Sequence, residues 1–200
     1  MNRNRVATAL AAALCLAAGA FAQQEKKAPE MTPEQKKEMD AMMAAGTPGA
    51  PHKGMAAKVG TYEAKVKSWQ DPAAPPMEST GTSTRSMALD GRVMVEEFKG
   101  SMMGMPFTGH GMQGYDNVTG KYWSTWNDSM STGIMLSEGT CDAKSACTFK
   151  GSWNDPLTKK VVTSRMTSKW TSPTVEVFEM YGPGKDGKEM KMMEITYTKK

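Results

Sequence analysis

From Val59 onward, hydrophobic and polar positions alternate over short segments that are rich in Thr, Val, Tyr, Trp and Met. Alternation with a period of two is typical of strands that bury one face. Turn signals such as Asp90-Gly91 and Asp186-Gly187 separate these segments from one another. The pattern predicts strands at residues 60–70, 78–88, 92–101, 106–116, 121–129, 132–141, 147–154, 160–170, 174–181 and 189–198.

The spacing of these strands determines the fold class. The turns are too short for the long crossovers that parallel strands require, so the sheet must be antiparallel, as a sandwich or a barrel. Similar strand lengths favour an all-β, up-and-down barrel of about ten strands, because closure removes exposed edges. Large side chains occupy both faces, as at Tyr122 and Trp123, so the pattern leaves the inward face undetermined.

The N-terminus has the features of an export signal. Arg3 and Arg5 precede an uncharged, Ala/Leu-rich run, and Ala20-Phe21-Ala22 has the small-x-small spacing of a signal peptidase site. We therefore expect residues 1–22 to be a signal peptide, removed to give a periplasmic or secreted protein.

A polar segment precedes the strands. Residues 23–51 are charged and contain several prolines. Thr32-Pro33 resembles a helix start, which predicts a short helix near 33–45 followed by a Pro/Gly linker. Residues 52–200 are then the β-barrel domain.

Two cysteines remain once Cys15 is removed with the signal. Cys141 and Cys147 flank a polar turn, and an exported protein meets an oxidising compartment. A pair of metal thiolates is the alternative, but no further Cys or nearby His completes such a site. We expect a disulfide, which stabilises the fold by about 2 kcal/mol in the chain-entropy model.

Composition narrows the functional classes. The 200 residues include 25 Lys+Arg and 21 Asp+Glu, for a net charge of +4, and the lysines are dispersed. This differs from the concentrated basic face of a nucleic-acid-binding protein. No segment after residue 22 is apolar over the roughly 18 residues of a membrane span. With two histidines, no phosphate loop and no Cys/His nucleophile pair, the chain is expected to bind no cofactor and is more readily understood as a non-enzyme.

Several local motifs resemble a known family. They are Gly60-Thr61-Tyr62, Trp69-Gln70-Asp71-Pro72, Gly91-Arg92, Met103-Gly104-Met105-Pro106-Phe107, Gly114-Tyr115-Asp116-Asn117, Ser124-Thr125-Trp126, and Asp186-Gly187-Lys188-Glu189 through Thr198. Over about residues 32–199 the chain is similar to the bacterial family called domain of unknown function 1579. That resemblance implies a lipocalin-like (calycin) barrel, distantly similar to the nitrobindins, with no established activity. A nitrobindin haem needs an axial His near the C-terminus, and none follows His110, so haem binding is not implied.

The expected function is binding of a small apolar or amphipathic molecule inside the barrel, because small barrels can hold one ligand. Candidate residues for the cavity are Trp126, His110, Met112, Glu194 and Tyr122. His110 lies between Gly109 and Gly111, which would leave room for an imidazole. The alternatives are that His110 donates to a neighbouring carbonyl and that Glu194 points to water.

Two other functions remain open. Met102, Met103, Met105, His110 and Met112 form a cluster of soft ligands that suits Cu(I), although methionine is also a common filler of irregular cores. An enzyme acting on a small substrate through Glu194 or His110 is the third hypothesis. Neither residue has a visible partner in the sequence.

Overall fold

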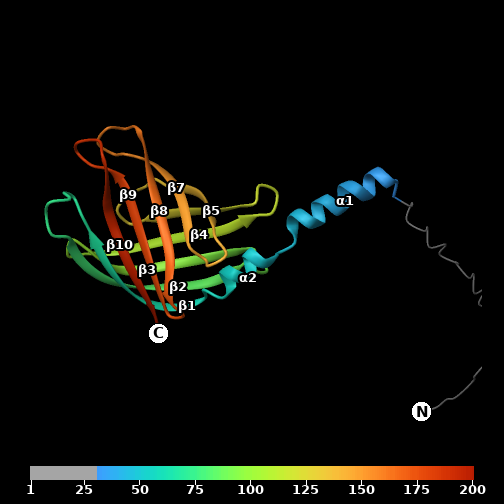
Figure 1. Cartoon of the computed structure of the whole chain (residues 1–200), viewed down its shortest axis with the longest axis horizontal. Helices are drawn as coiled ribbons and strands as arrows, with labels where there is room; N and C mark the ends of the chain where they lie inside the picture. The colour runs from blue at the N-terminus through green and yellow to red at the C-terminus, as the bar shows by residue number, and fades with distance from the viewer. Residues whose placement is uncertain (1–30) are drawn as a thin grey trace, which may run out of the picture.

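The computed structural model describes residues 31–200, so the predicted signal peptide lies outside the described residues. Two helices precede ten strands (Figure 1). The elements are α1 (Pro33–Gly46), α2 (Ala50–Ala56), β1 (Gly60–Ser68), β2 (Met77–Ala88), β3 (Val93–Met102), β4 (Met105–Asp116), β5 (Lys121–Asp128), β6 (Met135–Cys141), β7 (Cys147–Asn154), β8 (Val161–Ser172), β9 (Val175–Pro183) and β10 (Glu189–Lys199).

The ten strands form one closed antiparallel barrel in which each strand pairs with its neighbours in sequence. β1 pairs with β10 and completes the closure, with Val66 opposite Ile195 and Ala64 opposite Tyr197. This confirms the predicted up-and-down barrel of about ten strands. In Figure 1, β8 to β10 cross β3 and β4 steeply, as opposite walls of a closed barrel do.

Glycines on β4 make room for the tryptophans of β5. A Cβ atom on Gly109 would lie 2.2 Å from Cζ2 of Trp126, and one on Gly114 would lie 2.3 Å from Cζ2 of Trp123. Such separations are shorter than any real contact, so both positions require glycine. Trp126 packs against the interior core. The space beside His110 that the sequence suggested for an imidazole is therefore filled by the indole of Trp126.

The short helix α2 lies against one end of the barrel, near the beginning of β3 and the end of β4 (Figure 1). Met55 is 1% exposed, and the ring of His52 meets Tyr115 edge-on with centroids 5.9 Å apart. The hydroxyl of Tyr62 on β1 donates to the backbone oxygen of Lys58. These contacts cover one end of the barrel, hereafter the α2 end.

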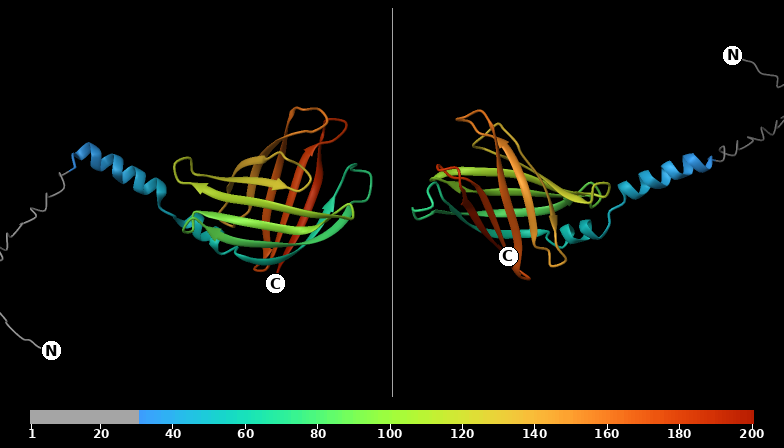
Figure 2. Two further views of the ribbon diagram at one scale, coloured as in Figure 1. Left: turned by 180° about the vertical axis from the view of Figure 1, so that it is seen from behind. Right: turned by 45° about the horizontal axis from the view of Figure 1, so that its top comes forward.

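The longer helix α1 has no buried residue. Thr32 caps its N-terminus in a capping box with Gln35, at the helix start that Thr32-Pro33 predicted. At its C-terminus, Asn117 donates to the backbone oxygens of the last turn and Arg92 donates to Gly46. Both views in Figure 2 show α1 extending away from the barrel. No helix within residues 31–200 is long and apolar enough to cross a bilayer.

Candidate functional site

The barrel interior holds a cavity of about 390 Å³. Its wall is mainly apolar and includes side chains from nearly every strand, among them Val66, Phe98, Phe107, Trp126, Phe149, Phe178 and Ile195. The cavity extends to Ser131, Ile134 and Asn154, exposed residues at the end opposite α2. Its size falls within the range of pockets for small ligands.

A wider depression of about 620 Å³ includes five charged side chains in its lining, Lys121, Glu138, Lys150, Arg165 and Glu189. Lys121 pairs with Glu138, and Arg165 pairs with Glu189, all four at least 42% exposed. Because these charges satisfy one another in solvent, the depression offers little to a ligand. The interior cavity is the stronger candidate.

Methionines form a large part of the cavity wall. Met193 on β10 is opposite Met180 on β9, and Met180 is opposite Met166 on β8, so three thioethers lie side by side across the inner surface. All three line the cavity. Methionine is unbranched and flexible, so this wall can adapt to ligands of different shape.

A buried ionic cluster lies toward the α2 end of the cavity. Arg85 is 5% exposed, and its Nη1 donates to Glu176 Oε2 at 2.5 Å. Its Nε lies 3.6 Å from Glu96 Oε2. The guanidinium Cζ is 4.7 Å from the ring centroid of Tyr62 and 4.5 Å from that of Tyr197, so both rings are in cation–π contact with Arg85. Together, Arg85, Glu96, Glu176 and the two tyrosines are called the polar floor below.

Hydroxyl groups orient the two carboxylates of the polar floor. Ser83 donates to Glu96 Oε1, and Ser168 donates to Glu176 Oε1. Buried Glu176 and half-buried Glu96 therefore each have a hydroxyl partner in addition to the guanidinium. This satisfies the general requirement that buried charges be paired and hydrogen-bonded.

The ionisation of the cluster follows from these contacts. Burial opposes the charge on Arg85, but Glu96 and Glu176 outweigh it and hold the Arg85 pKa above its ordinary value. Burial likewise opposes ionisation of Glu176, but Arg85 and the Ser168 hydroxyl hold the Glu176 pKa below its ordinary value. Complete burial, followed by the charge of Glu96, raises the pKa of Tyr197 well above its ordinary value. The cluster is therefore an ion pair network at neutral pH, with Tyr197 protonated.

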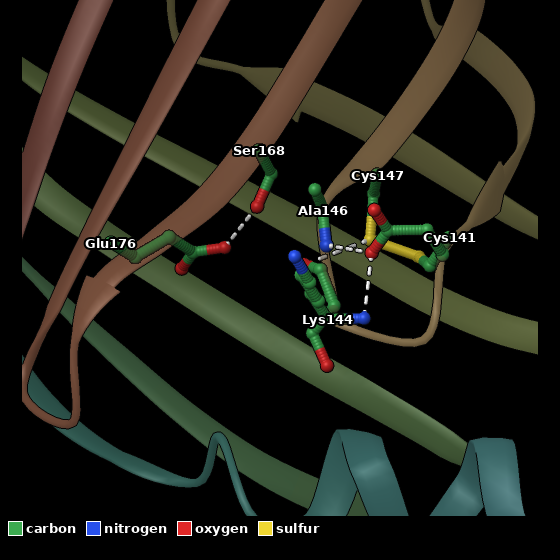
Figure 3. The surroundings of a disulfide bond; sticks show 8 residues. Cys141, Lys144, Ala146, Cys147, Ser168 and Glu176 are labelled. Carbon is green, nitrogen blue, oxygen red and sulfur yellow. Dashed lines mark hydrogen bonds between the residues drawn. A yellow bond between two sulfur atoms is a disulfide. The ribbon is translucent and has the colours of Figure 1, made fainter.

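A disulfide lies beside this cluster (Figure 3). Cys141 and Cys147 are the last pair of the β6–β7 hairpin, and their sulfur atoms are bonded at 2.02 Å. Asp142 stabilises the turn by accepting hydrogen bonds from the backbone nitrogens of Lys144 and Ala146. The structure thus joins the two cysteines across one hairpin, as expected. Cys147 also lines the cavity and is opposite Ser168, which links the hairpin to the polar floor.

Of the five predicted cavity residues, two face the barrel interior and two face outward, and the fifth, Met112, borders the cavity from the outer face. Trp126 and Tyr122 lie on the inward face of β5, where Trp126 lines the cavity and Tyr122 packs on Phe149. His110 and Glu194 do not line it. The alternation along β4 places His110 on the outer face, exposed, between two inward glycines. Glu194 also faces outward and binds Lys191 at 2.8 Å.

The fifth residue, Met112, shares the outward face of β4 with His110. Its side chain is 39% exposed, and it borders the cavity where β4 meets Thr125 of β5. It therefore belongs to the outer surface more than to the interior. Met112 faces outward because it is two residues from His110, and alternate residues of a strand share a face.

The proposed copper ligands occupy separate places. The β3–β4 hairpin puts Met102 opposite Met105, with Met103 in the turn. His110 is five residues beyond Met105 along β4, which is roughly 17 Å in an extended strand. His110 and Met112 are thus too far from the hairpin to share an ion with it. Among residues 31–200, no group of three or more His, Cys, Asp or Glu side chains is arranged to hold a metal.

The two carboxylates of the polar floor, Glu96 and Glu176, are not among the residues that the sequence pattern predicted for the site. The turn at Asp90-Gly91 contained the signal for one of them. A hairpin centred on that pair puts Arg85 opposite Glu96, which is the register observed. For Glu176 the sequence had no comparable signal, because it approaches Arg85 across the interior from 91 residues away.

A solved structure of a redesigned β-barrel is similar over 73% of this chain and 96% of its own, with 14% identity and a TM-score of 0.38. No curated protein matches the chain. The family model described as "Protein of unknown function (DUF1579)" matches residues 47–199, which cover all ten strands. The chain therefore belongs to the DUF1579 family.

Proposed function

We propose that this protein binds a small apolar or amphipathic molecule inside its barrel. The observation that carries the proposal is the interior cavity of about 390 Å³, with apolar walls, exposed residues at one end and buried charges at the other. Pockets that are mostly apolar with a few converging polar groups are the usual form of small-molecule sites.

The walls suit an elongated apolar ligand. Each methylene group that leaves water for such a cavity contributes about 0.8 kcal/mol. The row of Met166, Met180 and Met193 adjusts to the shape of the ligand, while Trp126 is fixed by its contact with Gly109. The site would therefore select ligands by their length and polarity more than by their exact shape.

The proposed site of action is outside the cytoplasm, in the periplasm or beyond. The signal-like residues 1–22 support export, and the Cys141–Cys147 disulfide suits an oxidising compartment. An exported barrel of this kind, similar to the calycins, would hold or carry a molecule that is poorly soluble in water.

A pair of tryptophan variants tests the proposal with the neutral apolar dye Nile red. Ser79 is half-buried and lines the cavity near Val66, so Ser79→Trp should fill it. The neighbouring Thr80 is exposed on the outer face, so Thr80→Trp is the matched control. We expect saturable dye binding to the unchanged protein and to Thr80→Trp, and at least about tenfold weaker binding to Ser79→Trp. Equal binding by the two variants would contradict an interior site.

A further inference from the structure

The guanidinium of Arg85 has more donors than the protein satisfies. It carries five N–H groups. Among residues 31–200 it makes one hydrogen bond, from Nη1 to Glu176. Its Nε has no hydrogen-bond partner, because the nearest acceptor, Glu96 Oε2, is 3.6 Å away. Nε is enclosed by protein, whereas Nη2, which also makes no hydrogen bond within these residues, is not enclosed. Unsatisfied donors at such a site are costly, so this edge of the cavity favours a ligand that brings an acceptor.

The rings of Tyr62 and Tyr197 limit how Arg85 can be approached. Their centroids lie 4.7 and 4.5 Å from Cζ and 6.4 Å from each other, so the two rings lie against neighbouring sides of the guanidinium. A ligand therefore approaches from the sides that the rings leave open, and the edge with free N–H groups is the side that offers hydrogen bonds. Contact at that edge is a directional hydrogen bond and not a stacking interaction.

The charges around the cavity oppose an anionic ligand. The ionisable side chains that line it are Lys58, Arg85, Glu96, Asp128 and Glu176, which are two cations and three carboxylates. A ligand carboxylate would add a fourth negative charge where the dielectric constant is low. An ammonium group would suit the net charge, but it has no lone pair to accept a hydrogen bond from Arg85.

We infer that the polar end of the ligand is an uncharged hydrogen-bond acceptor, such as an amide, ester or ketone carbonyl, held at the edge of Arg85. Its apolar part then extends along Phe178, Ile195 and the methionine row toward the open end. This inference rests on the proposed function and specifies the class of ligand. Arg85 acts as a specificity-determining residue, and Glu96 and Glu176 set its preference by neutralising its charge.

The test compares three ligands that share one alkyl chain. Decanamide, decanoate and decylammonium compete with Nile red for the unchanged protein at neutral pH. We expect decanamide to bind at least about tenfold more tightly than either ion, a difference of about 1.4 kcal/mol. Equal affinities, or tighter binding of decanoate or decylammonium, would overturn the inference while leaving the interior site intact. Failure of all three to displace the dye, with no effect of Ser79→Trp, would instead remove the proposed function.

A charge-neutral variant sharpens the result. Glu96→Gln keeps the shape and the acceptor for Ser83 but leaves the charge on Arg85 less balanced. In this variant decanoate should gain about tenfold in affinity, since its carboxylate replaces the charge that was removed. The neighbouring Glu97 is exposed on the outer face, so Glu97→Gln should show the unchanged ligand preference. The same gain in both variants would overturn a role for the polar floor.

Discussion

Arg85 on β2 and Glu176 on β9 are joined across the barrel interior by a hydrogen bond of 2.5 Å. β1 and β10 lie between these two strands in the sheet, so the contact connects parts of the wall that do not pair through their backbones. The ion pair therefore serves two purposes in our account. It connects β2 with β9 at the α2 end of the barrel, and it presents a neutralised guanidinium to the cavity.

The first prediction concerns the strength of this contact. Glu176→Gln should lower the free energy of unfolding by about 1.5–3 kcal/mol, the range for hydrogen bonds to charged groups, because Arg85 loses the charge of its closest buried partner while keeping Glu96. Urea unfolding measures the loss. Glu97→Gln on the outer face should change stability by no more than about 0.5 kcal/mol. Equal stability of the two variants would show that the ion pair contributes nothing to the fold.

The second prediction concerns acid. The pKa of Glu176 is held below its ordinary value of 4.5, so its ionised form stabilises the folded state at any pH above 4.5. That stabilisation is lost as the pH falls below 4.5 through the folded-state pKa, because the unfolded chain then binds the proton more tightly. The melting temperature of the unchanged protein should therefore fall more steeply below about pH 4.5 than that of Glu176→Gln. Parallel curves for the two proteins would contradict the assigned ionisation.

The third prediction concerns the disulfide. Replacing both Cys141 and Cys147 with Ser should lower the free energy of unfolding by about 2 kcal/mol without preventing folding, because the bridge closes a short loop in the unfolded chain. Chemical denaturation measures the difference, and thiol titration of the unfolded, unreduced protein checks the bridge itself. Two reactive thiols from this pair would show that the bridge does not form.

The fourth prediction concerns the glycine under Trp126. Gly109→Ala puts a methyl group where the indole lies and should destabilise the barrel by about 1–3 kcal/mol through overpacking. The fluorescence of Trp126 should shift at the same time as the ring moves. Gly54→Ala on α2, where a Cβ meets nothing within 4 Å, is the control and should not destabilise the protein, because Ala favours a helix over Gly. A stable Gly109→Ala protein with unchanged fluorescence would contradict the close packing.

The sequence predicted the fold better than the site, and the reason is the strength of the signals. Turn residues such as Asp90-Gly91 mark the hairpins directly, so the strands and the barrel followed from local pattern. The inward face of each strand was harder to predict from the sequence, because Trp123 and Trp126 are large side chains on opposite faces of β5. A choice of the wrong parity on β4 turns His110 from the outer face to the inner one.

The buried ion pair shows a second limit. The register of β2 on β3 follows from one short turn, which places Arg85 opposite Glu96. The contact with Glu176 depends on closure of the whole barrel and on the diameter of its interior. Local sequence contains no measure of either quantity, so that contact needed the structure.

The most direct test of interior binding follows the methionine methyl groups by NMR. With ¹³C-methyl methionine in the protein, titration with decanamide should shift the resonances of Met166, Met180 and Met193, which line the cavity. The methyl groups of Met39, Met42 and Met43 on the exposed helix α1 should stay unchanged. Shifts confined to the interior methionines are the result that our account predicts. Shifts at the α1 methionines with none in the interior would contradict it.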